Sequence, residues 1–163
     1  MYDRFQPARV PAGLVFDVVF LVTVAAPAAT FIRGALVVST AGLIDTCGAD
    51  PAVITGVALA DNNSAPGFNA ANNPATFTGR LQKVAVAKAN AVTVFSGYGT
   101  NGSSTRVTFT QADVGISYGV TAYTSVWTVD KAKTAASARV SVVAVDTDNG
   151  GVFFKVLSAN YLA

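Results

Sequence analysis

The chain has 163 residues, of which 52% are hydrophobic and only 12% charged, with a formal net charge of +2. Charged residues make up about a quarter of an ordinary soluble domain. Part of the outer surface must therefore be apolar, and contiguous exposed apolar surface usually marks an interaction site. The length suits one domain, and the high hydrophobic share excludes a disordered chain.

Histidine does not occur, and all nine acidic residues are Asp. Because histidine is the commonest general base and metal ligand, this composition argues against most hydrolases and metalloenzymes. We expect no catalytic residue, no cofactor and no metal site. The scattered cations form no basic patch, so nucleic acid is not an expected partner. Cys47 is the single cysteine; we expect a small buried thiol in a chain assembled under reducing conditions.

Residues 1–13 are predicted to form an extended N-terminal arm. Pro7 and Pro11 keep this segment out of a helix. Its aromatic residues Tyr2 and Phe5 are candidate anchors on a neighbouring molecule.

The apolar stretch 14–32 resembles a signal or transmembrane segment in composition. However, Asp17 lies within it and Pro27 interrupts it, and a carboxylate in lipid is costly. The Val- and Phe-rich part, 14–24, predicts a strand that is apolar on both faces and must be covered on both. We therefore expect neither a membrane span nor a cleaved leader. The candidate interface residues on this strand are Phe16 and Phe20.

Short apolar runs separated by turn residues follow, and this pattern predicts an all-β fold. We expect a small β-barrel or sandwich of about 8–10 short strands, with residues 14–163 as a single domain. The expected strands are 35–38, 43–44, 53–60, 81–88, 91–95, 106–110, 118–123, 126–129, 139–145 and 151–157. Residues 130–138 read equally as a helix or a loop.

Turn residues predict the connections between these strands. Ser39–Gly42 and Asp146–Gly150 have hairpin composition. Asp50 before Pro51 predicts a short helical turn, with Asp50 as its cap. Thr110–Asp113 fits a one-turn capping box.

The segment 61–79 has no periodicity, and long loops of this kind tend to be functional. Its aromatic residues Phe68 and Phe77 are therefore further candidate interface residues.

Three further patterns could carry chemistry. Gly97–Gly102 matches the G-x-G-x-x-G pattern of phosphate loops, but an expected strand follows it where a helix is needed, which favours a hairpin tip within a loop over 96–105. Asp146–Gly150 resembles a calcium loop but lacks the usual Glu, so a plain turn is favoured. Three aromatic residues on expected strands fit either a sugar-binding face or the core: Tyr118, Tyr123 and Trp127.

The order of these features resembles a known family. The segments that carry it are Arg33–Ser39, Ala41–Ile44, Gly48–Ala60, Thr110–Gly115, Tyr118–Val120, Trp127–Asp130, Arg139–Asp146 and Gly151–Leu157. Together they resemble capsid decoration (cement) proteins of tailed bacteriophages, over residues 31–158. The strand at 14–24 and the loop at 61–79 look like additions to that pattern.

The resemblance implies a non-enzymatic virion protein, assembled in the host cytoplasm. Such a protein binds the outside of a shell formed by a major capsid protein, as a trimer or dimer, and reinforces it. Two alternatives remain open: another virion component, such as a tail, baseplate or head-fibre subunit, and a carbohydrate-binding β-sandwich. A carboxylate-based enzyme is the least supported reading, because no motif indicates one.

Overall fold

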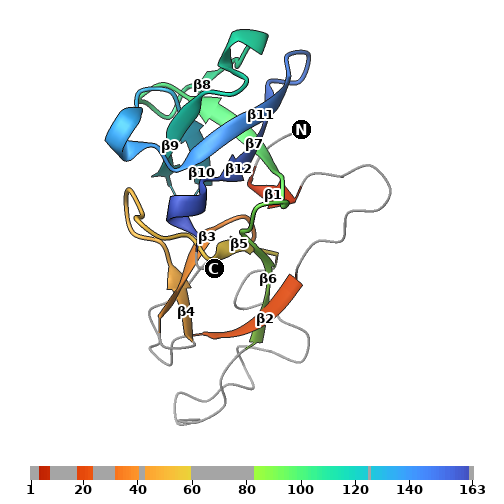
Figure 1. Cartoon of the computed structure of the whole chain (residues 1–163), viewed down its shortest axis with the longest axis vertical. Coiled ribbons are helices and arrows are strands. Elements are labelled where there is room, and N and C mark those ends of the chain that lie inside the picture. The colour runs from red at the N-terminus through yellow and green to blue at the C-terminus, as the bar shows by residue number, and fades with distance from the viewer. Residues whose placement is uncertain are drawn as a thin grey trace.

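The computed structural model describes residues 4–7, 18–23, 32–40, 43–59, 83–124 and 126–161. These residues form strands and single-turn 3-10 helices arranged in two sheets, which confirms the predicted all-β class (Figure 1). No helix in this described part has the length and apolar character to cross a membrane.

The smaller sheet is a closed barrel in the order β2-β4-β3-β5-β6. Its strands are β2 (Val18–Thr23), β3 (Leu36–Thr40), β4 (Leu43–Thr46), β5 (Gly56–Ala58) and β6 (Lys83–Lys88). β3 and β4 form the predicted hairpin, with Thr40 opposite Leu43. Gly56 lets β5 lie close to β6, because a Cβ atom there would overlap the carbonyl oxygen of Ala87.

The larger sheet has seven strands and is centred on β7. Its strands are β1 (Gln6–Pro7), β7 (Phe95–Thr100), β8 (Arg106–Val107), β9 (Ser117–Tyr123), β10 (Val126–Asp130), β11 (Val140–Asp146) and β12 (Gly151–Val156). The path runs β1-β7-β10-β9-β11-β12, and an additional β7–β12 pairing joins five of these strands into a ring. β8 also pairs with β7, which therefore has four partner strands.

In the described part of the chain, three 3-10 helices connect or follow the strands of the larger sheet. They are η2 (Gln111–Asp113), η3 (Ala135–Ser137) and η4 (Ser158–Asn160). η2 confirms the predicted capping box: the backbone N–H and hydroxyl of Thr110 both donate to Asp113 Oδ2, over 2.7 and 3.1 Å. Residues 130–138, read as helix or loop, contain only η3 between turns.

One continuous hydrophobic cluster links the barrel to the larger sheet. The barrel contributes Leu36, Ile44, Val57 and Val86, all fully buried. The larger sheet contributes the rings of Phe95 and Phe154, and the segment after β8 contributes that of Phe109. The core therefore runs through both sheets.

The prediction around β7 was wrong in two respects. Residues 91–94 lie outside any strand, although a strand was expected there, and residues 96–100, assigned to a loop, belong to the buried central strand Phe95–Thr100. The glycine content that suggested a loop serves packing instead. A Cβ on Gly97 would overlap the ring of Phe5, and one on Gly99 would overlap the ring of Phe109.

The predicted helical turn at Asp50 is also wrong. Residues 49–52 contain bends but no helical turn, and Asp50 has a φ of 56°. A helix cap needs an extended backbone at that position, so Asp50 in the left-handed region cannot begin a right-handed turn.

Candidate functional site

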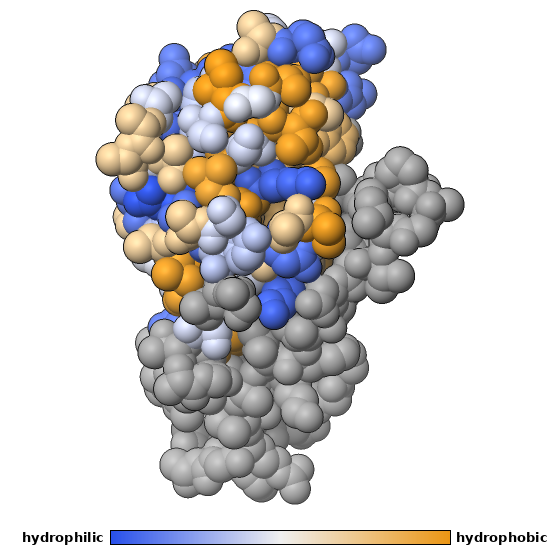
Figure 2. Space-filling model, in the orientation of Figure 1, coloured by the Kyte–Doolittle hydropathy of each residue, from blue (hydrophilic) through white to orange (hydrophobic). Residues whose placement is uncertain are grey.

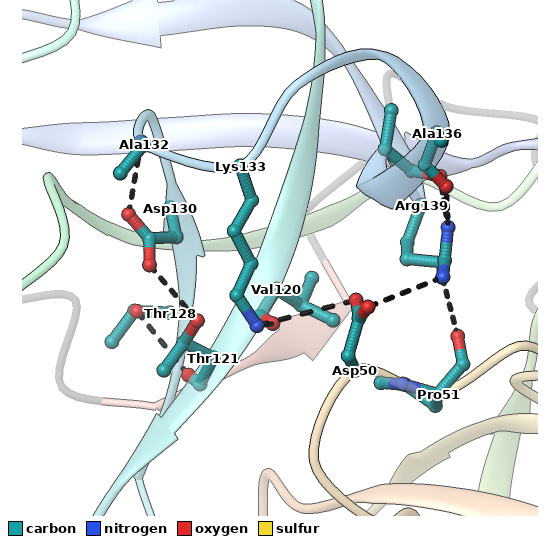
Figure 3. Close-up of polar contacts among 11 residues, drawn as sticks. Asp50, Pro51, Val120, Thr121, Thr128, Asp130, Ala132, Lys133, Ala136 and Arg139 are labelled. Carbon is teal, nitrogen blue, oxygen red and sulfur yellow. Dashed lines mark hydrogen bonds and ion pairs between the residues drawn. The ribbon is translucent and has the colours of Figure 1, made fainter.

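A charged cluster lies where the segment after β4 meets the larger sheet (Figure 3). Asp50 Oδ2 lies 3.5 Å from the guanidinium of Arg139, and its Oδ1 lies 4.0 Å from Lys133 Nζ. Arg139 also donates from Nε to the carbonyl of Pro51 over 2.6 Å and from Nη1 to that of Ala136 over 2.8 Å. One guanidinium thereby joins the segment after the barrel hairpin to the loop before β11.

The chain's C-terminal part closes the same junction. The backbone N–H of Ile54 donates to the carbonyl of Asn160 over 2.6 Å. The side-chain amide of Asn160 donates back to the carbonyl of Ala52 over 2.9 Å. These hydrogen bonds and the ion pairs of Asp50 hold the two sheets in one arrangement.

Asp130, at the end of β10, is a second polar centre. Its Oδ1 accepts from the backbone N–H groups of Gly102 and Ala132, over 2.8 and 3.1 Å. Its Oδ2 accepts from the hydroxyl of Thr121 over 2.9 Å. Asp130 is only 2% exposed, so these partners offset the cost of burying its charge.

Asp113, in η2, is the third polar centre, and its carboxylate is buried like that of Asp130. Besides Thr110, it accepts hydrogen bonds from Lys131 Nζ over 2.8 Å and from the Tyr118 hydroxyl over 2.7 Å. Burial alone would raise the pKa of Asp113, but these hydrogen bonds outweigh it and lower the pKa to about 2. Burial, together with the hydrogen bond and charge of Asp113, raises the pKa of Tyr118 to about 12.

These three carboxylates have structural partners and lie apart from one another. In the described part of the chain, no group of three or more Cys and Asp side chains is placed to hold a metal ion. Asp113 stays ionised far below neutral pH, which makes it a poor proton donor or acceptor for chemistry near pH 7. The hydrogen bonds and ion pairs of the three carboxylates hold loops against strands.

Cys47 is a free, buried thiol, as predicted. Burial, with a smaller contribution from the charge of Asp45, raises its pKa to about 12. The thiolate is the reactive form of cysteine, so this side chain is held unreactive.

The Phe5 socket is the apolar site formed by Phe95, Gly97 and Phe154 of the larger sheet and by Gly34, just before β3 of the barrel. Phe5 is only 1% exposed, and its ring centroid lies 4.7 Å from that of Phe154, which in turn lies 5.9 Å from that of Phe95. A Cβ on Gly34 would lie 2.9 Å from the carbonyl oxygen of Phe5, and one on Gly97 would overlap its ring. Next to Phe5, β1 pairs with β7 through Gln6 opposite Ser96.

The β11 edge is an exposed apolar site formed by Ile116, Val143 and Ala144. Ile116 and Val143 are 44% and 37% exposed, and Ala144 is also exposed. Val142 donates to the carbonyl of Ile116 over 3.0 Å, so Ile116 lies directly beside β11. Beyond that point residues 144–146 pair with β12, and no other strand among the described residues pairs with them.

Most of the predicted interface residues lie outside the described part of the chain: Tyr2, Phe16, Phe68 and Phe77. Phe20 is in β2, where its backbone is opposite Ala85. Phe5 is described in full and is buried within its own chain; its role as an anchor on a neighbouring molecule stays a prediction. The division into an arm at 1–13 and one domain at 14–163 stays a prediction, although Gln6 and Pro7 already belong to the sheet.

The sugar-binding platform loses two of its three rings. Trp127 and Tyr118 are 4% and 7% exposed, and the ring of Phe109 packs edge-on against Tyr118 at 5.4 Å. A stacking platform needs exposed ring faces, so both residues belong to the core, one of the two readings that the sequence left open. Tyr123 is half-buried at the end of β9.

The calcium-like loop is a turn in which the carboxylate of Asp146 accepts hydrogen bonds from the backbone and side-chain N–H groups of Asn149.

Sequence reasoning missed the Phe5 socket and the polar centres at Asp50 and Asp130; at Asp113 it found the capping box with Thr110 but not the other partners. One local signal did exist for the socket: Phe95, Gly97 and Gly99 alternate with Ser96, Tyr98 and Thr100, which places both glycines on one face of a strand.

Comparisons with known proteins add no relative: no family model, no curated protein and no solved structure matches this chain.

Proposed function

We propose that this chain is a non-enzymatic structural protein of a phage virion, which coats the outside of the capsid and reinforces the shell through repeated contacts with the major capsid protein and with other copies of itself. The observation that carries the proposal is the β11 edge, where exposed apolar side chains stand beside Ala144 and Val145, which among the described residues pair with β12 alone. The resemblance of residues 31–158 to decoration proteins supplies the capsid as the partner.

A strand edge of this kind is suited to pairing with another chain. Natural proteins usually protect such edges with lysines, prolines or covering segments, because unpaired backbone groups attract further strands. Here the edge carries Val143 and Ala144, and Ile116 extends the apolar surface beside it. Backbone pairing would supply affinity, and the apolar side chains would supply specificity.

The rest of the visible surface agrees with a protein that is covered by neighbours. Figure 2 shows apolar residues among hydrophilic ones over the larger sheet. With only 12% charged residues, the chain has few side chains that would repel a partner. Burying about 1,000 Å² of apolar surface corresponds to roughly 25 kcal/mol of gross driving force, before the costs of association.

Binding to purified empty heads of the parent phage tests this proposal. The full chain is added to heads at increasing concentration, and the bound fraction is measured after sedimentation. We expect saturable binding, with a fixed number of copies per head. Val143→Lys is expected to weaken binding at least tenfold, because it places a charge in the contact.

Thr147→Lys is the matched control, since Thr147 is exposed in the β11–β12 turn; it adds the same charge without touching the edge and should bind normally. Lack of binding by the unaltered chain to heads would refute the capsid role. Binding to purified tails or baseplates instead would establish the alternative virion location. Equal binding by both lysine variants would refute the β11 edge as the contact.

A further inference from the structure

We propose that the Phe5 socket is the site where copies of this chain are linked: the segment Arg4–Pro7 of one copy occupies the socket of a second copy, as an exchanged strand. This inference deepens the proposed function and rests on its self-association. The partner is a second copy of the same chain. The segment that occupies the socket of that copy is the one that fills the socket within a single chain.

The socket is shaped for this segment in particular. Gly97 provides room for an aromatic ring in the middle of a buried strand, and Gly34, at a φ of 87°, lets the backbone of Phe5 come close. Phe154 packs against the ring. Outside the socket, the hydroxyl of Ser96 lies 3.4 Å from the carbonyl oxygen of Gln6. A site that accepts one short sequence in one register recognises the same sequence on any copy.

The segment is also the easiest part of the larger sheet to exchange. β1 lies before the barrel in the chain, whereas every other strand of its sheet follows β6. Ten residues, 8–17, join it to β2, and a connection of that length spans at most about 36 Å. Exchange therefore moves one two-residue strand and leaves every other pairing within its own chain.

Crowding of copies on a lattice favours the exchange. An exchanged Phe5 makes the same contacts in its partner's socket as in its own, so the contact energy changes little. The equilibrium between the exchanged and unexchanged arrangements then depends on the local concentration of neighbouring copies. Within one chain, a short connection corresponds to an effective concentration in the millimolar range. Copies held side by side on a capsid reach comparable local concentrations. Each exchange would then tie two neighbours together without any new contact surface.

Engineered disulfides distinguish the two arrangements. Gln6 and Ser96 are directly opposite in an antiparallel pair, which puts their Cα atoms in the range that a disulfide spans. In a Cys47→Ala background, a Gln6→Cys chain and a nitrogen-15-labelled Ser96→Cys chain are mixed in denaturant, refolded together and oxidised. Mass spectrometry of the digested protein then identifies any disulfide between residues 6 and 96 of different chains.

A matched pair controls for random oxidation. Ser141 and Lys155 are directly opposite in the β11–β12 hairpin, which has no reason to exchange. Ser141→Cys and Lys155→Cys chains, mixed in the same way, should form at most a trace of the interchain disulfide. We expect the 6–96 interchain product to exceed the 141–155 product at least tenfold, and Phe5→Ala in the Gln6→Cys chain to abolish this excess.

Light scattering on the unmodified full chain separates this inference from the proposed function. An oligomer with the 6–96 interchain disulfide supports both. The strand exchange is overturned if the chain is an oligomer but the interchain disulfide does not form, while a Gln6→Cys, Ser96→Cys double variant forms the 6–96 disulfide only within one chain. The assembly role would then still stand. A stable monomer at high concentration, without interchain product, overturns both.

Discussion

Lys131 Nζ lies 2.8 Å from Asp113 Oδ2, and this pair joins the end of β10 to the single turn of η2. The same ammonium lies 4.5 Å from the ring centroid of Phe109 and donates to the carbonyl of Thr108. The side chain of Asp113 is 10% exposed, so little water screens the pair. The geometry makes the stability of the larger sheet depend on the ionisation of Asp113.

The first prediction concerns pH. The pKa of Asp113 is lowered from 3.8 to about 2 in the folded chain, so its ionised form favours folding. This contribution is fully present above pH 4 and is lost as pH falls from 4 to 2. It amounts to about 2 kcal/mol. Thermal unfolding of the unaltered chain and of Asp113→Asn should differ most at pH 5–7 and converge towards pH 2.

The control for that series is Asp148→Asn, because Asp148 is exposed in the β11–β12 turn. Its melting temperature should follow that of the unaltered chain throughout. A constant difference between the unaltered chain and Asp113→Asn down to pH 2 would contradict the role given to the Asp113 carboxylate.

The second prediction concerns Gly97. Replacing it with Ala puts a methyl group into the ring of Phe5, and overpacking of this kind costs about 2 kcal/mol. We expect the melting temperature to fall by roughly 5 °C. Gly48→Ala is the matched control, because a Cβ there meets no atom within 4 Å. Similar melting temperatures for the two variants would show that the socket tolerates a side chain.

The third prediction concerns Arg139, whose guanidinium binds three carbonyl groups and Asp50. Lysine keeps the charge but cannot reproduce this planar set of donors. Arg139→Lys should therefore lower the free energy of unfolding by about 1–2 kcal/mol, measured by urea denaturation. Arg4→Lys makes the same replacement at an exposed position and should have no measurable effect. If both variants unfold alike, the junction does not depend on the guanidinium.

The fourth prediction concerns the thiol of Cys47, which is 8% exposed and has a pKa of about 12. An aromatic disulfide reagent at pH 8 should label the folded chain at least a hundredfold more slowly than the chain in denaturant. Absorbance of the released thiolate follows the reaction. Rapid labelling of the folded chain would show that the segment around Cys47 opens readily.

The sequence predicted best those strands whose apolar residues alternate. Val140 and Val142 on β11, and Val152, Phe154 and Val156 on β12, are buried as their period of two requires. The turn between them was predicted from its Asp, Asn and Gly residues. These features are local, so a short window of sequence contains all the information that they need.

The errors arose where distant residues decide the structure. Gly97 belongs to a strand because the ring of Phe5, 92 positions earlier in the sequence, occupies the space of its missing side chain. Asp50 leaves the helical region and pairs with Arg139, 89 positions later. The local propensities of these segments carry no information about either distant partner, and such tertiary contacts override the preferences of a short segment.

The central place of β7 has a consequence for biosynthesis. This strand pairs with β1 near the start of the chain and with β12 near its end. Its partner Phe154 follows Phe5 by 149 positions in the sequence. The ring of the larger sheet cannot close until β12 has left the ribosome. Sheets that depend on such remote pairings fold slowly, so newly made copies pass through a period in which β7 is open to intermolecular association.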